Sequence, residues 1–211
     1  MRATPKTTQQ PSSVLDTPVK QRIVEQATRL FTLGGVNIST VMIAHFANTN
    51  VAQVIKLFGT RERLVSDFLK SLVDQAEAEW TEIERDSLGD PEAQLRNWML
   101  HAEMAADRAS QLPHAQLSRA AVDFLGFDEN SPLLDRIQKF WQAERRKIVK
   151  LCEQCKFRDP AGLADKLLLV VQGARNERNC YGFAGPGAKA REAGDDLMVA
   201  HGAQRKPLLE L

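Results

Sequence analysis

The side chains best suited to contact another molecule gather in one short stretch, Asn50 to Phe58. Within it, Ala52, Gln53 and Lys56 are expected on the face opposite an apolar stripe. Glutamine can form two hydrogen bonds with adenine, alanine can contact the methyl group of thymine, and lysine can reach guanine or phosphate. Ordinary solvated residues on a short helix would give the same pattern, so the surrounding elements have to decide between the two interpretations.

Further candidates stand where short helices are expected to begin. Asn50 and Thr49 precede one helix, Thr40 opens another, and Thr60 and Arg61 stand at the start of a third. A side-chain oxygen in such a position caps free backbone N–H groups, and the same positions commonly bind phosphate. The sequence leaves both roles open for these residues, as helix caps or as contacts to DNA phosphates.

The elements expected around this stretch are four helices. A first helix begins at Thr17-Pro18 and ends at Gly34-Gly35, and two short helices, Thr40 to about Phe46 and Val51 to Phe58, follow it. A fourth runs from Thr60 to about Glu84. The residues expected to face inward on the first three are Val19, Ile23, Ala27, Leu30 and Phe31, then Val41, Ile43 and Ala44, then Val51, Val54, Ile55 and Phe58. Two short helices around a tight turn are typical of a helix-turn-helix.

The distribution of charge favours an anionic partner for this N-terminal part. The whole chain carries a net charge of only +1, but residues 1–63 hold eight Lys and Arg against three acidic residues, which gives 8 − 3 = +5. The remaining residues therefore sum to 1 − 5 = −4. A basic head on a mildly acidic body indicates that the head meets a polyanion such as DNA, although a chance excess on a solvated face stays possible as the alternative.

The rest of the chain is predicted to be helical, which makes the fold all-α. No stretch alternates with period two, and Pro, Gly, Ser or Asp bounds each helical pattern. The expected helices are Glu92 to Arg108, Leu112 to Phe124, Pro132 to Cys155, Pro160 to Tyr181 and about Gly187 to His201. Residues 1–16 are expected to be a disordered arm, 17–63 a DNA-binding head, 64–205 a helical body and 206–211 a tail.

Composition and motifs argue against several other classes of protein. No apolar run approaches the roughly 20 residues that span a bilayer, and the N-terminus lacks the apolar core of a signal peptide, so a cytoplasmic protein without a membrane partner is expected. No metal or cofactor motif is found, because none of the four histidines follows a glutamate by three positions. Catalytic elbows and phosphate-binding loops are also missing. Cys152, Cys155 and Cys180 are expected to be reduced thiols.

Several residues make the chain resemble the tetracycline-repressor-like (TetR) family of transcriptional regulators. In the head, the matching residues are Arg22-Ile23-Val24, Ala27, Leu30-Phe31, Gly35, Val41-Met42-Ile43-Ala44, Ala47, Asn50 and Phe58-Gly59-Thr60-Arg61-Glu62-Arg63-Leu64. In the body they are Cys155 to Pro160, Leu163-Ala164, Leu167-Leu168-Leu169 and Gly173-Ala174. The head also departs from the family pattern: Asn48-Thr49 replaces the usual Gly-Val of the turn, Ile55 replaces a common tyrosine, and the loop after Gly35 is one residue short.

The resemblance implies a three-helix DNA-binding head followed by a helical-bundle body that dimerises and binds an effector. A ligand-responsive repressor that binds a palindromic operator as a homodimer is the expected function, and Pro132 to Cys155 and Pro160 to Tyr181 are the candidate dimer helices. A small apolar or aromatic effector would meet the residues Trp98, His101, Met104, Phe124 and Trp141, which could equally be core. The alternative is a helical ligand-binding or interaction protein whose head no longer binds DNA.

Overall fold

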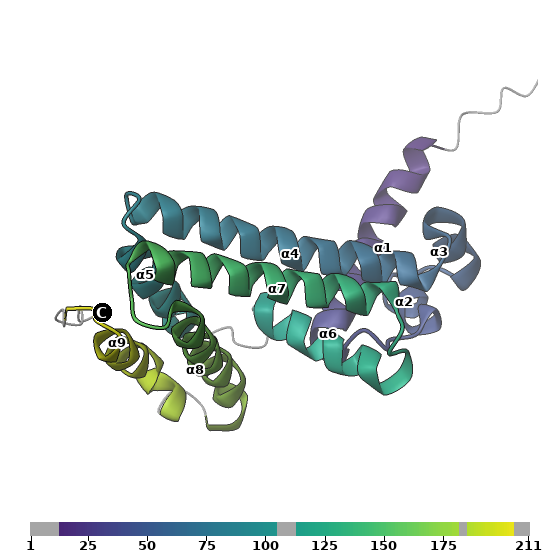
Figure 1. Cartoon of the computed structure of the whole chain (residues 1–211). Coiled ribbons are helices and arrows are strands. Elements are labelled where there is room, and N and C mark those ends of the chain that lie inside the picture. The colour runs from purple at the N-terminus through teal and green to yellow at the C-terminus, as the bar shows by residue number, and fades with distance from the viewer. Residues whose placement is uncertain (1–12, 105–112, 182–184, 205–211) are drawn as a thin grey trace, which may run out of the picture. The chain divides into compact units, whose positions relative to one another are not determined.

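The computed structural model describes the backbone of residues 13–104, 113–181 and 185–204 (Figure 1). These residues form helices, turns and no strand, which confirms the predicted all-α class. The elements are α1 (Ser13–Gly34), α2 (Thr40–Phe46), α3 (Val51–Phe58), α4 (Arg61–Asp86), α5 (Pro91–Met104), α6 (Pro113–Phe127), α7 (Pro132–Gln154), α8 (Pro160–Tyr181), the 3₁₀ helix η2 (Pro186–Lys189) and α9 (Ala190–Ala200). No helix in these described ranges is both long and apolar enough to cross a membrane.

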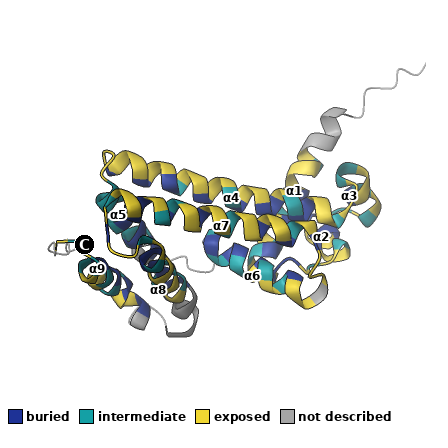
Figure 2. Cartoon of the chain, in the orientation of Figure 1, coloured by how far each residue is buried: buried dark blue, intermediate teal, exposed yellow. Residues whose placement is uncertain are grey.

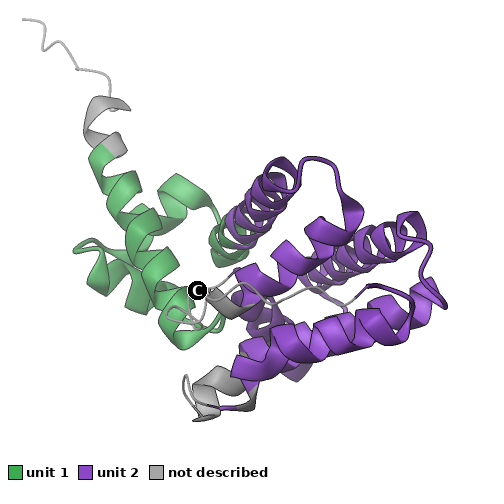
Figure 3. Cartoon of the chain, turned by 90° about the vertical axis from the view of Figure 1, so that its left-hand side faces the viewer, with its two compact units in different colours: residues 1–68 green, residues 69–211 purple. Residues whose placement is uncertain are grey.

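The chain divides into two compact units, residues 1–68 and 69–211 (Figure 3). The boundary falls within α4 rather than at Arg63, where the sequence pattern placed the end of the head. Leu64, Val65 and Phe68 are buried, and the ring of Phe68 packs 5.4 Å from that of Phe31 on α1. The first two turns of α4 therefore complete the core of unit 1, and the rest of this helix belongs to unit 2.

Unit 1 is built from α1, α2, α3 and the start of α4 around one small core. Its largest buried side chain is Phe31, and the other buried apolar residues are Ile23, Ala27, Val36, Ile43, Ala44, Ala47, Val54, Leu64, Val65 and Phe68. Helix α1 begins at Ser13, before the expected Thr17, and carries Pro18 inside it. The expected helix starts at Thr40 and Val51 are both confirmed.

Two residues that the sequence pattern placed inside the core of unit 1 are in fact exposed. Val41 is 67% exposed and Ile55 is 53% exposed. Helices as short as α2 and α3 bury only a narrow stripe, since Ile43 and Ala44 are the buried residues of α2 and Val54 is the buried residue of α3. The prediction for Val41 and Ile55 was wrong because it assumed the wider buried stripe of a long amphipathic helix.

Unit 2 is a bundle in which α7 packs against α5, α6 and α8, and α8 also packs against α9 and η2. Buried faces line the inner sides of these helices (Figure 2). The core includes Trp80 and Trp98, whose rings stack 6.1 Å apart with an interplanar angle of 15°. Aliphatic residues from five helices fill the remaining core: Ile83, Leu95, Ile148, Leu151, Leu163, Leu167, Val171 and Met198.

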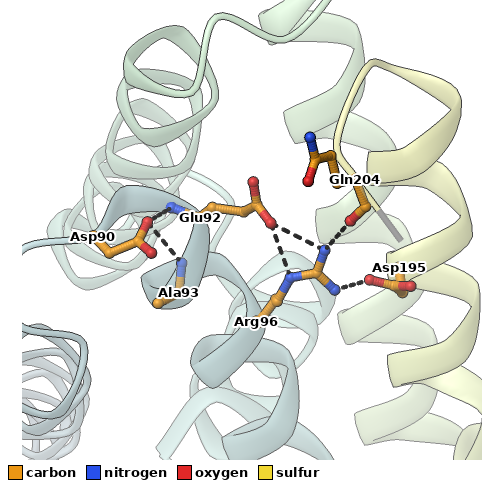
Figure 4. Close-up of polar contacts among 6 residues, drawn as sticks. All are labelled: Asp90, Glu92, Ala93, Arg96, Asp195 and Gln204. Atoms are coloured by element: carbon orange, nitrogen blue, oxygen red, sulfur yellow. Dashed lines mark hydrogen bonds and ion pairs between the residues drawn. The ribbon is translucent and has the colours of Figure 1, made fainter. Parts of the chain in front are cut away.

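A polar junction joins α5 to α9 and to the segment that follows α9 (Figure 4). Arg96 on α5 forms an ion pair with the buried carboxylate of Asp195 on α9. The same guanidinium donates to Glu92 Oε1 at 3.1 Å and to the carbonyl oxygen of Gln204 at 3.2 Å. Asp90 caps the start of α5 by accepting from the Glu92 backbone N–H at 2.9 Å. Burial of Asp195 is thus compensated by charge, as a buried carboxylate requires.

Candidate functional site

The turn between α2 and α3 has the geometry of a Schellman motif. The Thr49 N–H donates to the Ala44 carbonyl at 3.0 Å, and the Asn48 N–H donates to the His45 carbonyl at 3.1 Å. Asn48 has φ of 51°, a left-handed conformation that glycine or asparagine adopts most readily. Asparagine thus holds the turn in place of the glycine common in the family. Arg22 on α1 also donates to the Ala47 carbonyl at 3.5 Å.

Helix α3 is fixed at both ends, so its outer face has a defined direction. Asn50 caps it through Oδ1, which accepts from the Gln53 N–H at 2.9 Å. At the other end Gly59, with φ of 77°, closes the helix. Val54 is buried, which turns Ala52 and Lys56 to the exposed side, with Gln53 half-buried beside them. The sequence interpretation of these three as an outward-facing set therefore matches their positions.

The outer face of α3 also includes Ile55, which sequence reasoning assigned to the core. Successive residues of a helix are turned by 100°, so Ile55, Ala52 and Lys56 share one side of α3. An exposed isoleucine can contact the methyl group of thymine. Sequence reasoning assigned Ile55 to the core because it is apolar and stands four positions after Val51, as a residue of an inward stripe would. The shortness of α3 could have indicated otherwise, since a short helix buries few residues.

Of the four candidates at other helix starts, Thr60 and Arg61 have local roles in unit 1. Thr60 caps α4 by accepting from the Arg63 N–H at 3.3 Å. Arg61 donates to the Ile38 carbonyl at 2.9 Å and to the Val36 carbonyl, so its guanidinium is engaged with the α1–α2 loop. Thr40 and Thr49 are half-buried at the ends of the α1–α2 loop and the α2–α3 turn.

A second candidate site lies inside unit 2, where charged side chains from four helices meet. We call Glu79 (α4), His114 (α6), Glu144 (α7) and Arg175 (α8) the buried polar cluster. The side chains of His114, Glu144 and Arg175 are almost completely buried, and that of Glu79 is 19% exposed. Each stands where its helix faces the core, as Glu144 does seven residues after Ile137 and four before Ile148. The polar residues of this cluster occur at positions where the helix pattern is otherwise apolar. This pattern in the sequence indicates a buried polar site, which the sequence analysis did not identify.

The distances within the buried polar cluster fall into two groups. His114 Nε2 lies 3.2 Å from Glu144 Oε1, which makes one close pair. Around Glu79 the contacts are longer: 3.8 Å to His114 Nδ1, 3.9 Å to Arg175 NH2 and 4.0 Å to His101 Nδ1. Glu79 is therefore surrounded by three nitrogen-bearing side chains, none of them within direct hydrogen-bond distance.

Electrostatics in the buried polar cluster favour a charged Glu144. Burial by itself would raise the pKa of the Glu144 carboxyl, but the nearby imidazole of His114, the charge of Arg175 and the indole N–H of Trp98 together lower it below its usual value. Burial also lowers the pKa of the Arg175 guanidinium, against the opposing charges of Glu144 and Glu79. The cluster therefore holds full charges in the interior of a bundle, where unpaired charge is costly.

Three of the five residues expected to line an effector site lie next to the buried polar cluster. Trp98 faces Glu144 through its indole N–H, and His101 lies beside Glu79. The ring of Trp141 lies 5.8 Å from that of His114 and next to Phe140, whose ring lies 5.7 Å from His114 and 5.2 Å from Trp141. Phe124 is buried on α6. Met104 ends α5, and its side chain lies outside the described residues.

Cys152 on α7 and Cys155, which caps the C-terminal end of α7, give no sign of reactive chemistry. Cys152 and Cys155 are free thiols. Burial raises the pKa of the Cys152 thiol to about 12, so it stays protonated at neutral pH. Within the described ranges no three His, Cys, Asp or Glu side chains are grouped in a way that could hold a metal ion.

An apolar groove of about 320 Å³ runs between α8 and the segment of η2 and α9. Its lining includes Leu169, Val170, Gly173 and Ala174 from α8 and Ala190 and Ala193 from α9. Leu169 is 74% exposed, an unusual position for a large apolar side chain in the middle of a helix. The outer face of α8 is thus more apolar than packing within one chain requires.

Comparison with known proteins shows which solved structures share this fold. No family model matches the sequence, and no curated protein matches it either. A TetR-family transcriptional regulator from Streptomyces coelicolor superposes with a TM-score of 0.72 at 15% identity, covering 89% of this chain and 97% of that one. The chain has the TetR-family fold. A TetR-family regulator from Agrobacterium tumefaciens has a TM-score of 0.70 at 17% identity, with 89% and 100% of the two chains covered.

The TetR-family fold also appears in a transcriptional regulator from Saccharomonospora viridis solved in complex with choline. It has a TM-score of 0.66 and 18% identity, and the match covers 88% of this chain and 97% of that chain. These matches extend over nearly the full length of the neighbours, so the TetR fold accounts for both units.

Proposed function

We propose that this protein is a DNA-binding transcriptional regulator that binds a palindromic operator as a homodimer. The observation that carries the proposal is the outer face of α3. A Schellman turn and the Asn50 cap fix the helix, and Ala52, Ile55 and Lys56 point away from its buried side. A short helix presented in this way can enter the major groove, where glutamine, lysine and small apolar side chains read base edges. Its solved neighbours are regulators and not enzymes.

Within this proposal Thr40, Thr49 and Thr60 contact phosphates, and Lys56 contacts guanine or phosphate. These hydroxyls stand at the starts of α2, α3 and α4, where backbone N–H groups add to the attraction for an anion. Arg61 supports the same face indirectly, because its bonds to the α1–α2 loop hold the start of α4 against α2. Within this proposal the protein works in the cytoplasm, where it meets its operator DNA.

Homodimerisation follows from the specificity that one head can supply. A single helix-turn-helix contacts too few base pairs for useful discrimination, so two heads must bind together. The face that best fits a second copy is the apolar outer side of α8 with its groove toward α9, because Leu169 could fill the equivalent groove of the partner.

A small effector with an apolar or aromatic body would bind in unit 2 beside Trp98, His101 and Trp141. The effector would act through α4, which contributes residues to both units. A coupling of about 1 to 3 kcal/mol between effector and DNA would change operator affinity by roughly 5- to 150-fold. Repression relieved by the effector is the simplest outcome of such coupling.

A second candidate function is that of a ligand-binding or interaction protein that does not bind DNA. It is favoured by the exposed apolar side chains of α2 and α3, which include Val41, Met42, Phe46 and Ile55. These side chains could form a protein-binding surface instead of a DNA-binding one.

Selection of bound duplexes from a random DNA pool separates the two functions. The regulator proposal expects enrichment of a sequence with two-fold symmetry and half-sites about one helical turn, or a multiple of it, apart. If repeated rounds enrich no sequence over the starting pool, the DNA-binding proposal fails and the second function takes its place. A variant with Gln53→Ala and Lys56→Ala together, treated in parallel, controls for binding by other basic surfaces.

A further inference from the structure

Arg175 presents buried hydrogen-bond donors that the protein itself does not use. It is 2% exposed, and its Nε and NH1 groups have no acceptor within the described part of the chain. The remaining nitrogen, NH2, lies 3.9 Å from Glu79 Oε1, too far for a direct hydrogen bond. Gln172, one helical turn earlier on α8, has an amide nitrogen that is likewise buried and unpaired. A buried guanidinium in this state costs free energy until an acceptor reaches it.

Glu144 does not serve as that acceptor in the present arrangement, because both of its carboxylate oxygens are themselves buried without a hydrogen-bond partner among the described residues. Its Oε1 lies 3.2 Å from His114 Nε2, and its carboxylate also faces the Trp98 indole N–H, although neither contact has the geometry of a good hydrogen bond. The attraction between Glu144 and Arg175 acts through charge alone. The unmet need at Arg175 is therefore for a further acceptor.

We propose that the buried polar cluster binds the carboxylate of a small organic acid, with Arg175 as the principal donor. This inference rests on the proposed function, because the acid would be the effector of the regulator. A guanidinium and a carboxylate match in shape and charge, and their hydrogen bonds are stronger than neutral ones. The separations of 3.8 to 4.0 Å around Glu79 belong to the same site, since they are distances that an inserted polar atom can bridge.

Arg175 supplies the positive charge that an anion would meet in this site. Glu79, Glu144 and Arg175 sum to −1 − 1 + 1 = −1. The carboxylate would therefore bind to Nε and NH1 of Arg175, which have no acceptor in the described part of the chain, and not to NH2, which lies 3.9 Å from Glu79. A cationic ligand would instead be placed against Arg175.

The surroundings of the buried polar cluster define the rest of the ligand. The neighbouring rings of Phe140 and Trp141 both lie against the ring of His114, at 5.7 and 5.8 Å, and Trp98 stacks on Trp80. Aromatic walls around one buried donor favour a carboxylate attached to an apolar body, such as an aromatic or alkyl acid. Such an acid has the apolar body expected of the effector and the carboxylate that Arg175 would bind.

Calorimetric titration with benzoate and hexanoate tests the proposal, with benzamide, hexanamide and choline as neutral and cationic probes. We expect at least one acid to bind about tenfold or more tightly than its amide, a difference of about 1.4 kcal/mol. Arg175→Met should abolish this preference and Arg175→Lys should reduce it, because lysine keeps the charge but lacks the planar fork. Arg145→Met, which removes an exposed arginine paired with Asp165, should bind like the wild type.

Several outcomes would overturn the proposal. These are binding of neither acid to the wild type, equal binding of acid and amide, binding of choline alone, or an acid preference that survives Arg175→Met in folded protein. If Arg175→Met does not fold by circular dichroism, Arg175→Lys decides. Operator binding is measured on the same samples. If the protein binds DNA but no acid, only this inference is refuted. If the protein binds an acid through Arg175 but binds no DNA, the proposed regulatory function is refuted and the acid-binding site stands.

Discussion

His114 Nε2 lies 3.2 Å from Glu144 Oε1, and both side chains are almost fully buried inside unit 2. This pair joins α6 to α7 at a position where each helix turns its apolar face inward. Buried pairs of this kind add little to stability in comparison with apolar residues, but loss of one partner leaves the other charge unpaired. The pair is thus better explained by a polar function of the interior than by stability.

The first prediction concerns acid stability. The pKa of Glu144 is lowered in the folded protein, so the folded state binds this proton less well than the unfolded state does. The stability that Glu144 contributes is therefore present above its unfolded value of 4.5 and is lost as the pH falls through the lower folded value. Glu144→Gln should cost roughly 1 to 3 kcal/mol of unfolding free energy at neutral pH.

Urea denaturation at a series of pH values measures this effect. The difference between wild type and Glu144→Gln should shrink as the pH falls below 4.5, because the wild-type carboxyl also becomes neutral. A matched control is Asp74→Asn, which alters an exposed carboxylate paired with Lys70. A constant difference between wild type and Glu144→Gln at all pH values would show that the carboxyl charge is irrelevant.

The second prediction concerns the turn before α3. Asn48 has φ of 51°, where an alanine side chain is strained but glycine is not. Asn48→Ala should destabilise unit 1 by about 1 to 2 kcal/mol, and Asn48→Gly should be close to neutral. Thermal unfolding followed by circular dichroism compares them, with Asn37→Ala as the control at an exposed loop position. Equal stability of the Ala and Gly variants would contradict the role given to this asparagine.

The third prediction separates base reading from phosphate contact on α3. Gln53→Ala should weaken binding to a selected operator by about 1 to 3 kcal/mol and relax one base position. Lys56→Ala, if Lys56 contacts phosphate, should weaken all sequences alike and lower the salt dependence of binding. Ile55→Ala should reduce a preference for thymine at one position. Fluorescence anisotropy with single-base operator variants distinguishes the three, and unchanged affinity in all of them would exclude α3 as the reading helix.

The fourth prediction concerns self-association. Leu169→Glu places a charge on the apolar outer face of α8 and should convert the dimer to a monomer, as measured by light scattering at micromolar concentration. Leu125→Glu is the control, because Leu125 is also exposed but lies on α6. A dimer that persists in Leu169→Glu and dissociates in Leu125→Glu would move the interface to α6.

The sequence was sufficient to predict where α2 and α3 begin and end, although it placed the start of α1 too late. Ser39 and Asn50 accept the backbone N–H groups of Met42 and Gln53, as their types and positions indicate. These are local interactions, which residue type and spacing determine directly. Ile55 was wrongly assigned to the core because its exposure depends on how much of α3 the rest of unit 1 covers. That coverage is set by helix packing and cannot be determined from the sequence of α3 alone.

The buried polar cluster could not be assembled from the sequence. Glu79, His114, Glu144 and Arg175 lie on four helices, and only the packing of unit 2 brings them together. Their positions on apolar faces indicate burial, but which opposite charge each one meets depends on helix packing that no pattern within a single helix specifies.

The central claim, that two copies of α3 read a symmetric operator, is tested most directly by titrating the selected palindrome against a duplex with one half-site scrambled. Anisotropy should show binding to the intact palindrome at least about a hundredfold tighter, because each lost base pair costs roughly 1 to 3 kcal/mol and several are lost together. Equal affinity for the two duplexes, at a salt concentration where the palindrome binds, would contradict the account.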